Sequence, residues 1–482
     1  MPPTTSLDIH LIAIGGTGMA PLAALLAQAG HRVRGSDGPL YPPMSTLLEA
    51  AGIRPYEGFD PAHLEPPPDL VVVGNAVPRD NPEAVEAERR GLARLSMPEA
   101  LARFFLADRR PLVVAGTHGK TTTSALAAWV WTACGRDPGF LVGGVPLDLG
   151  ASFRHGGGER FVVEGDEYNA AYFDRGPKFL HYRAETVLLT SVEYDHADLY
   201  PSPESLVDAY RKLARSLPPS GLLVACGDSD GVREVAREAR CPVVLYGFRD
   251  DNDVCFASTP RAGSEGVRFS IREADGSRHD LSLGVWGAHN ASNALAVWAA
   301  ARRDGLEPEG VAAALASFRG VARRQEVVGE VGGVTVVDDF AHHPTAVAET
   351  LAALRGRWPG RRLVVCFEPR SLTAGRAFFR DGYMKAFARA DRVLFAPLYH
   401  RARLEPEQRL DLVRLAAELS AAGTPATAAE SVEALAGELV AEAVPGDVVI
   451  TMSSGSFEGL PRRIVALLGG RVGAVPGPAP AG

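Results

Sequence analysis

One segment limits the fold of this chain more than any other, and it reads Gly116-Thr117-His118-Gly119-Lys120-Thr121-Thr122-Thr123. It stands between an apolar strand pattern at 112–115 and a helical pattern, the setting of a phosphate-binding loop. In such a loop, glycines let backbone N–H groups surround phosphate oxygens at a helix amino-terminus, a lysine neutralises the terminal phosphates and a hydroxyl binds Mg2+. Lys120 and Thr121 stand at the last two positions. The loop is a shorter variant, because Val114 stands where G-x-x-x-x-G-K-[ST] has its first glycine; a glycine turn that only starts a helix is the alternative.

Acidic residues follow the strand expected at 161–163, in the order Glu164-Gly165-Asp166-Glu167. A carboxylate at the carboxyl end of a strand parallel to that of the loop can complete the coordination of nucleotide-bound Mg2+. We therefore expect one of the three at the metal, with a solvated acidic turn as the alternative. The strand expected at 187–190 leads to His196, which is either a second metal ligand or a residue at a helix start.

Polar side chains further along the chain are expected to border the nucleotide base. His289, Asn290 and Asn293 fall at the start of a helix expected over 290–302, where amides and an imidazole bind an adenine edge or cap the helix. His342 and His343 follow the strand expected over 334–338. Neighbours on a strand point to opposite faces, which disfavours a metal site with both histidines. At a strand end they are expected beside a nucleotide.

A second glycine turn lies near the start of the chain, between a strand expected at 9–14 and a helix expected at 19–29. The turn reads Gly15-Gly16-Thr17-Gly18, and Asp37 ends the next strand about 20 residues later, as in nucleotide-binding βαβ units. A third strand, 70–73, leads into Gly74-Asn75. A G-x-G turn alone is weak evidence for a dinucleotide, so an oxidoreductase is a poor second to the function that the phosphate-binding loop indicates.

Three domains are expected, since 482 residues exceed one ordinary core and about 150 residues per domain is usual. The predicted boundaries are 1–108, 109–320 and 321–482, the first falling at a charged break over 107–110. In the third domain, strands expected at 334–338, 363–367, 392–395 and 448–452 alternate with helices. That alternation predicts a small parallel α/β sheet.

Composition excludes several functional classes. The net charge of -8 argues against a nucleic-acid partner, which clustered lysines and arginines would hold. Five widely spaced cysteines without a C-x-x-C pair indicate reduced thiols. Neither a leader pattern at the start nor an apolar run near the ~20 residues of a membrane span is found, so a cytoplasmic location without membrane contact is expected. The oligomeric state is left open.

The motifs, in their order along the chain, resemble those of the Mur ligase family. They are G-T-H-G-K-T-T-T, Glu164 and His196, His289-Asn290 with Asn293, Arg324, and D-D-F-A-H-H-P-T at 338–345. The resemblance covers essentially the whole chain. It implies a three-domain α/β architecture, with a Rossmann-like amino-terminal domain for the UDP-sugar, a central P-loop ATPase domain, and a Rossmann-like carboxy-terminal domain that binds the incoming peptide and closes on ATP. It also implies an ATP- and Mg2+-dependent ligase that joins a carboxylate to an amine through an acyl-phosphate.

The resemblance also assigns roles to matching positions. It implies that Lys120, Glu164 and His196 are catalytic, and that Thr121, Glu164 and His196 surround Mg2+. The residues implied at the UDP-sugar are Gly16, Thr17, Gly18, Asp37 and Asn75, and those near the peptide are Arg370 and Ser371. The residues implied at ATP are Gly116, Thr117, His118, Gly119, Lys120, Thr121, Thr122, His289, Asn290, Asn293, Arg324, Asp339, His342 and His343. Gly165 stands where the family usually has alanine.

Three stretches resemble one branch of the family most closely, at 41–48, at 167–174 with Lys178-Phe179, and at 367–371 with Thr373. That branch joins UDP-N-acetylmuramate to L-alanyl-γ-D-glutamyl-meso-diaminopimelate in peptidoglycan recycling. The amino-terminal glycine turn with Gly35-Ser36-Asp37 also resembles the branch that adds L-alanine in peptidoglycan biosynthesis, which is the alternative. A nucleotide-gated binding protein without activity would be expected to lack Lys120, Glu164 or His196, and all three are present.

Overall fold

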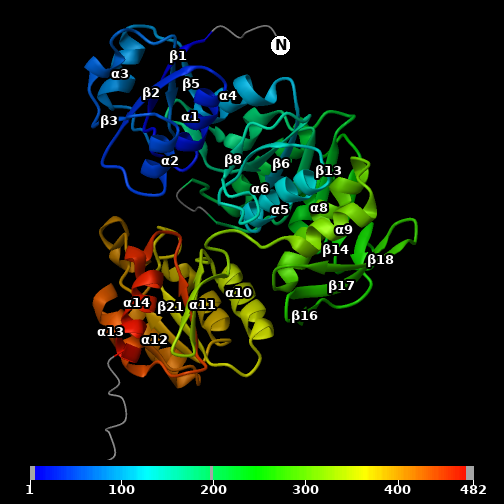
Figure 1. The fold of residues 1–482 in the computed structure, drawn as a ribbon, viewed down its shortest axis with the longest axis vertical. Coiled ribbons are helices and arrows are strands. Elements are labelled where there is room, and N and C mark those ends of the chain that lie inside the picture. The colour runs from blue at the N-terminus through cyan, green and yellow to red at the C-terminus, as the bar shows by residue number, and fades with distance from the viewer. Residues whose placement is uncertain (1–5, 196–198, 474–482) are drawn as a thin grey trace, which may run out of the picture.

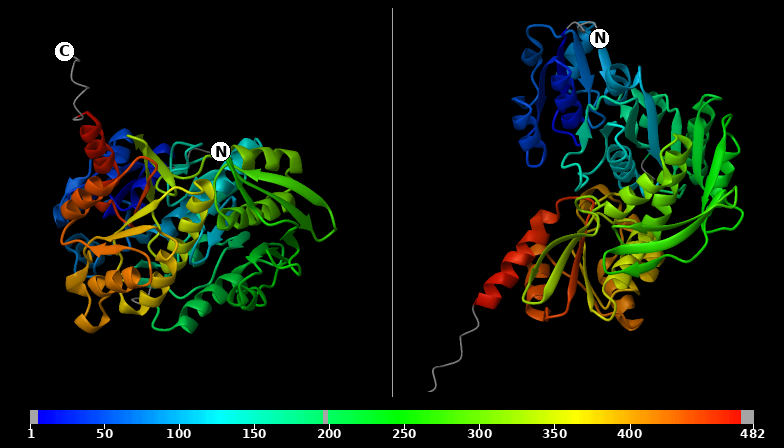
Figure 2. Two further views of the ribbon diagram at one scale, coloured as in Figure 1. Left: turned by 90° about the horizontal axis from the view of Figure 1, so that it is seen from below. Right: turned by 45° about the vertical axis from the view of Figure 1, so that its right-hand side comes forward.

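The computed structural model describes residues 6–195 and 199–473, so His196 lies outside the described residues. Three α/β units follow one another along the chain, each built on its own sheet (Figure 1). The amino-terminal and carboxy-terminal units lie at opposite ends, and the central unit joins them along one side (Figure 2). The predicted α/β class with three such units is confirmed. None of the described helices is both long and apolar enough to cross a membrane.

The first sheet is parallel, with strand order β3-β2-β1-β4-β5. Because β1 and β4 are neighbours, the glycine turn after β1 and Asn75 after β4 lie at the same carboxyl edge. The strands are β1 (Asp8–Ile12), β2 (Arg32–Asp37), β3 (Tyr56–Glu57), β4 (Leu70–Val73) and β5 (Arg94–Ser96). The helices are α1 (Met19–Gln28), α2 (Met44–Ala50), η1 (Pro61–Leu64), α3 (Pro82–Arg89), α4 (Met97–Leu101) and η2 (Ala102–Leu106).

The central sheet has β6 (Arg110–Ala115) between β12 (Thr186–Leu189) and β9 (Arg160–Gly165), all parallel. The Gly- and charge-rich stretch after residue 250 forms an antiparallel extension of this sheet. Other strands are β7 (Gly139–Leu141), β8 (Phe153–Arg154), β13 (Leu222–Cys226), β14 (Val243–Gly247), β15 (Val254–Phe256), β16 (Arg261–Gly263), β17 (Gly266–Glu273) and β18 (Arg278–Leu283). The helices are α5 (Lys120–Ala133), α6 (Pro203–Ser216), α7 (Asp230–Ala236), α8 (Ala288–Arg303) and α9 (Pro308–Ser317). A separate hairpin of β10 (Asn169–Ala171) and β11 (Asp174–Pro177) leads into η3 (Lys178–Tyr182).

The third sheet has the order β19-β20-β24-β21-β22-β23. It is parallel as predicted, except at one edge, where β19 pairs with β20 antiparallel. The strands are β19 (Glu326–Val331), β20 (Val334–Asp339), β21 (Leu363–Phe367), β22 (Arg392–Phe395), β23 (Ala426–Ala428) and β24 (Val448–Met452). The helices are α10 (Pro344–Arg357), α11 (Arg380–Phe387), α12 (Leu412–Ala421), α13 (Val432–Glu442) and α14 (Leu460–Gly473), with short turns η4 (Ala377–Phe379), η5 (Arg401–Arg403), η6 (Pro406–Gln408) and η7 (Phe457–Gly459).

The central strands of each sheet are buried and mostly apolar because helices cover both faces. In β4, β12, β21 and β24 every residue is buried. Parallel strands buried on both faces lack the alternation of half-exposed strands, and their backbone polar groups are satisfied within the sheet. Several of the predicted site residues lie just beyond the carboxyl ends of these strands.

Candidate active site

Two glycines shape the phosphate-binding loop between β6 and α5. Gly116 has φ 132° and Gly119 has φ 81°, conformations that side chains rarely adopt. A Cβ on Gly116 would lie 2.3 Å from Thr190 Oγ1, and one on Gly119 would lie 2.9 Å from Asn293 Oδ1. The loop therefore packs against the end of β12 on one side and against α8 on the other, with no room for a side chain at either glycine.

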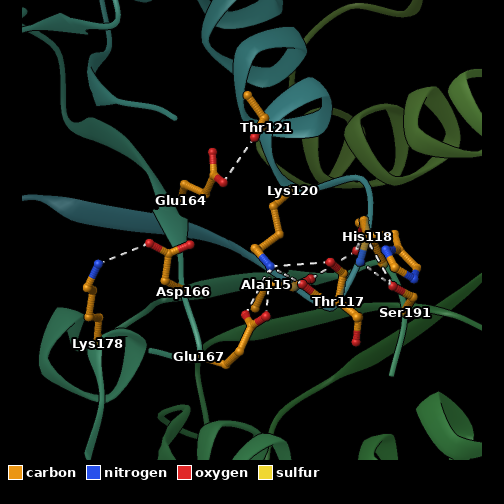
Figure 3. Close-up of polar contacts among 12 residues, drawn as sticks. Ala115, Thr117, His118, Lys120, Thr121, Glu164, Asp166, Glu167, Lys178 and Ser191 are labelled. Carbon is orange, nitrogen blue, oxygen red and sulfur yellow. Dashed lines mark hydrogen bonds and ion pairs between the residues drawn. The ribbon is translucent and has the colours of Figure 1, made fainter. Parts of the chain in front are cut away.

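Lys120 pairs with a carboxylate that the sequence did not single out. Its Nζ lies 2.9 Å from Glu167 Oε2 and 2.6 Å from the Gly116 carbonyl oxygen (Figure 3). Both side chains are almost entirely buried, with 11% and 1% exposure. Burial alone would lower the pKa of Lys120, but the charges of Glu167, Asp166 and Glu164 outweigh it and raise that pKa. Lys120 is therefore held as an ammonium beside the loop.

Glu164 lies where the sequence predicts a metal ligand. Thr121 Oγ1 donates to Glu164 Oε1 at 3.0 Å, and the Gly143 N–H donates to Glu164 Oε2 at 2.8 Å. Burial, and secondarily the charge of Asp166, raises the pKa of Glu164 although Lys120 opposes this. A hydroxyl beside a carboxylate oxygen is the hard donor set that Mg2+ prefers, so these residues fit the implied ion. Asp166 instead pairs with Lys178 at 3.2 Å, and the predicted third ligand, His196, lies outside the described residues.

His118 of the loop belongs to a chain of contacts between the central and third units. His118 Nε2 lies 2.9 Å from Glu193 Oε2, and Thr345 Oγ1 of α10 donates to Glu193 Oε1 at 2.8 Å. The rings of His118 and His343 are 4.6 Å apart. Burial alone would raise the pKa of Glu193. The hydrogen bonds from His118 and Thr345 outweigh burial and lower that pKa to about 2. Glu193 was not predicted, although it lies in the same strand exit as His196.

A cavity of about 930 Å3 adjoins the loop and runs between α8 and α10. At its α8 wall, Asn290 Nδ2 donates to the Trp286 carbonyl oxygen at 2.7 Å, and no side chain caps the start of α8. Burial lowers the pKa of His289 to about 4 and keeps that ring neutral. The predicted ATP residues on the cavity wall are His118, Gly119, Thr122, His289, Asn290, Asn293, Arg324 and Asp339.

Arg324 reaches the loop from the connection to the third unit. Its Nη2 donates to Thr121 Oγ1 at 3.3 Å, and its guanidinium lies over the Phe340 ring at 4.6 Å. Arg323 and Gln325 on either side have φ values of 61° and 54°, a strained conformation for residues with side chains. The backbone here is bent to direct Arg324 inward.

The side chains of Asp339 and His342 mainly contact backbone groups in this structure. Asp339 Oδ2 accepts from the Gln325 N–H and Oδ1 from the Ala341 N–H, both at 2.8 Å. His342 Nδ1 lies 3.1 Å from the Phe340 carbonyl oxygen. Both residues thus fix the entrance to the third unit around the cavity.

The residues predicted for the UDP-sugar lie at the carboxyl edge of the first sheet. Gly16, Thr17 and Asn75 are exposed there, and Gly18 is partly buried. Asp37 accepts from the Gly15 N–H at 2.7 Å and from the Gly38 N–H at 2.8 Å. Its carboxylate therefore shapes the glycine turn.

Arg370 and Ser371 follow β21, as predicted, at the carboxyl edge of the third sheet. The Arg370 guanidinium lies 3.9 Å from the centre of the Tyr399 ring, whereas its closest approach to Glu368 is 3.5 Å, at the limit of a hydrogen bond. A Cβ on Gly455 would lie 2.0 Å from Arg370, so that glycine makes room for the side chain. Ser371 Oγ accepts from the Ala374 N–H at 3.0 Å and closes the following turn.

Models of Mur ligase domains match this chain in three consecutive stretches. "Mur ligase family, catalytic domain" matches residues 8–109, "Mur ligase middle domain" matches 114–301, and "Mur ligase, glutamate ligase domain" matches 323–455. The chain belongs to the Mur ligase family. Membership confirms the predicted enzyme class, an ATP-dependent ligase.

Similar proteins include two kinds of Mur ligase. The UDP-N-acetylmuramate–L-alanyl-γ-D-glutamyl-meso-2,6-diaminoheptandioate ligase of Escherichia coli is 38% identical over 471 residues, which cover 95% of this chain and 98% of the relative. The UDP-N-acetylmuramate–L-alanine ligase of Rubrobacter xylanophilus is 39% identical over 394 residues, 82% of this chain and 84% of the relative. The crystal structure of a murein peptide ligase from Psychrobacter arcticus has a TM-score of 0.73 at 32% identity and covers 98% of this chain and 100% of its own.

Proposed function

We propose that this Mur ligase joins the lactyl carboxylate of UDP-N-acetylmuramate to the amino group of L-alanyl-γ-D-glutamyl-meso-diaminopimelate, with cleavage of ATP to ADP and phosphate. The reaction would take place in the cytoplasm, in peptidoglycan recycling. One observation carries the choice of amine: the Escherichia coli relative with this printed activity is 38% identical over 95% of the chain and 98% of its own length, whereas L-alanine ligases that cover 94–96% of the chain are 35–37% identical. An alignment of that extent includes the third unit, where the incoming amine is expected.

Chemistry at the carboxylate requires activation, because a carboxylate does not react with an amine at neutral pH. We place the γ-phosphate of ATP at Lys120, which would exchange its contact with Glu167 for a phosphate oxygen. Arg324, 3.3 Å from Thr121 Oγ1, would add a second cation from across the unit boundary. Mg2+ held by Thr121 and Glu164, with His196, would neutralise phosphate charge. Together these groups favour the transfer of the phosphoryl group and the tetrahedral intermediate that follows amine attack.

The peptide is placed at Arg370 for a reason of charge. Its carboxylates need cations along a groove, whereas free L-alanine needs only a small pocket. Stacking on Tyr399 holds the Arg370 guanidinium, and its ion pair with Glu368 is long, at 3.5 Å. That cation is therefore available to an anionic group of the incoming peptide.

The experiment compares amines at fixed UDP-N-acetylmuramate and Mg-ATP, following ADP release, with a control lacking the UDP-sugar. We expect a kcat/KM for the tripeptide about tenfold or more above that for L-alanine, the worth of one charge-assisted contact. The second candidate is L-alanine addition, favoured by the 39% identity to the Rubrobacter xylanophilus ligase. A higher kcat/KM with L-alanine would put that activity in place of the first.

A further inference from the structure

We propose that Glu99, Asp174 and His181 form a binding site for one divalent transition-metal ion such as Zn2+, between the first and central units. Each residue offers one ligand atom, and these atoms lie within 4.8 Å of one another. Asp174 Oδ2 and His181 Nε2 are already 2.7 Å apart. An ion with bonds of about 2.1 Å joins ligands up to roughly 4 Å apart, so small rotations of these partly exposed side chains close the site.

Backbone contacts fix both carboxylates so that one oxygen of each is left for the ion. Asp174 Oδ1 accepts from the Gly176 N–H at 3.0 Å, which leaves Oδ2 toward His181. Glu99 Oε2 accepts from the Ser96 N–H at 2.7 Å and from Ser96 Oγ at 2.8 Å. The hydrogen bonds of the described residues do not include Glu99 Oε1. Outer contacts of this kind orient metal ligands and raise affinity.

Charge favours a divalent cation over an empty cluster. Two carboxylates and a neutral imidazole carry a formal charge of -2, which one divalent ion balances. The Asp174–His181 pair balances only one carboxylate, and only when the imidazole is protonated. Arginines also line the adjacent cavity, but among the described residues no ion pair joins one to Glu99 or Asp174. Arg109, for example, donates to the His155 and Gly156 carbonyl oxygens, both at 2.8 Å.

Access comes from a cavity of about 630 Å3 that Glu99 and His181 line. Three protein ligands with an open side leave room for water to complete the coordination. One imidazole with two carboxylates suits the borderline first-row ions, and among these Zn2+ binds more tightly than Mn2+ in the usual order of affinities.

The position sets this site apart from the ATP site. The cavity includes Pro111, near the first residue of β6, whereas the phosphate-binding loop follows the last residue of that strand. Glu99 lies in α4 of the first unit, and Asp174 and His181 lie in β11 and η3 of the central unit, with α4 packed against η3. An ion here would connect the two units and fix their relative orientation, with no part in the reaction.

The test titrates chelator-treated, nucleotide-free protein with Zn2+ by calorimetry and with Co2+ by visible absorption. Cluster variants are Glu99→Gln, Asp174→Asn and His181→Asn; control variants are Glu164→Gln in the ATP site and Asp80→Asn at an exposed carboxylate of the first unit. Circular dichroism establishes that each is folded.

We expect one Zn2+ to bind wild type, with a Kd that rises about tenfold or more in each cluster variant and is unchanged in both controls. The Co2+ absorption band should change in His181→Asn, which loses the nitrogen ligand. Absence of Zn2+ binding by wild type, or equal affinity in the cluster variants, would overturn the proposal. Loss of binding in Glu164→Gln alone would also overturn it, by placing the ion in the ATP site.

Discussion

Replacing Glu167 by glutamine should lower the thermal stability of the nucleotide-free enzyme and increase the stabilisation that ATP provides. At 2.9 Å and an effective dielectric constant of about 20, the Lys120–Glu167 pair attracts with roughly 6 kcal/mol, which the cost of burying both charges partly offsets. Removing one partner of such a pair typically costs about 3–5 kcal/mol because the other charge stays buried. A loss of about 3 kcal/mol lowers the Tm of a unit of about 200 residues by roughly 6–12 °C. Phosphate would then supply the missing negative charge.

Thermal unfolding with and without Mg-ATP measures both effects. Glu167→Gln should have a lower Tm than wild type in buffer and a larger rise with Mg-ATP, so that the two proteins converge at saturation. Asp166→Asn is the matched control for loss of the direct contact. The charge of Asp166 also favours the Lys120 ammonium, but Asp166 pairs with Lys178 and makes no hydrogen bond to Lys120 among the described residues, so its effect on Tm should be smaller. The double variant Lys120→Met with Glu167→Gln should regain stability, since it leaves no buried charge unpaired. An unchanged Tm in buffer together with an unchanged ATP response would refute the exchange of Glu167 for phosphate.

Three further predictions concern catalysis. Lys120→Ala should lower kcat about 100-fold or more with the circular dichroism spectrum retained, and a kcat above a tenth of wild type would contradict its assignment. Glu164→Gln and His196→Ala should each raise the Mg2+ concentration needed for turnover. Mg2+ titrations that superimpose on that of wild type would mean that both residues have only a structural role. Arg370→Ala should raise the tripeptide KM about tenfold, or about 1.4 kcal/mol, with the KM values for ATP and UDP-sugar little changed. An equal rise in all three KM values would point to misfolding instead.

The sequence predicted the buried strands well and the edges poorly. Runs such as 70–73 and 363–367 are apolar throughout because both faces are covered, so their strands matched the prediction to the residue. β19 was missed: it pairs only at the sheet edge, and its residues are half exposed. The antiparallel strands after residue 250 were also missed, since Gly and charged residues there resemble a loop. These edge strands form hairpins with the next strand along the chain, and their half-exposed, Gly- and charge-rich residues lack the continuous apolar run by which the buried strands were predicted.

The candidate site was likewise predicted only in part. Motif spacing predicted the loop glycines and the position of Glu164, because phosphate and metal require particular groups at a strand end. The same spacing did not indicate which of Glu164, Asp166 and Glu167 would contact which cation. That choice depends on the course of the chain beyond β9: Glu164 lies within the strand and faces Thr121, whereas Glu167 lies past its end and meets Lys120. The pairing of Glu193 with Thr345 likewise requires two units to meet, a contact over 152 positions in sequence.

If the peptide binds in the third unit as proposed, the connection at Arg324 would link its binding to ATP chemistry in the central unit. Gln325 is tied to Asp339 at the end of β20, so the backbone after Arg324 follows the third unit. Arg324 itself reaches Thr121 in the central unit. Rotation of the third unit away from α8 would therefore withdraw a cation from the loop and break the contact of Thr345 with Glu193 at the same time. On the proposed mechanism we therefore expect phosphoryl transfer to have its full set of charges only when the unit that carries Arg370 is closed, which would limit ATP cleavage when no amine is present to receive the activated carboxylate.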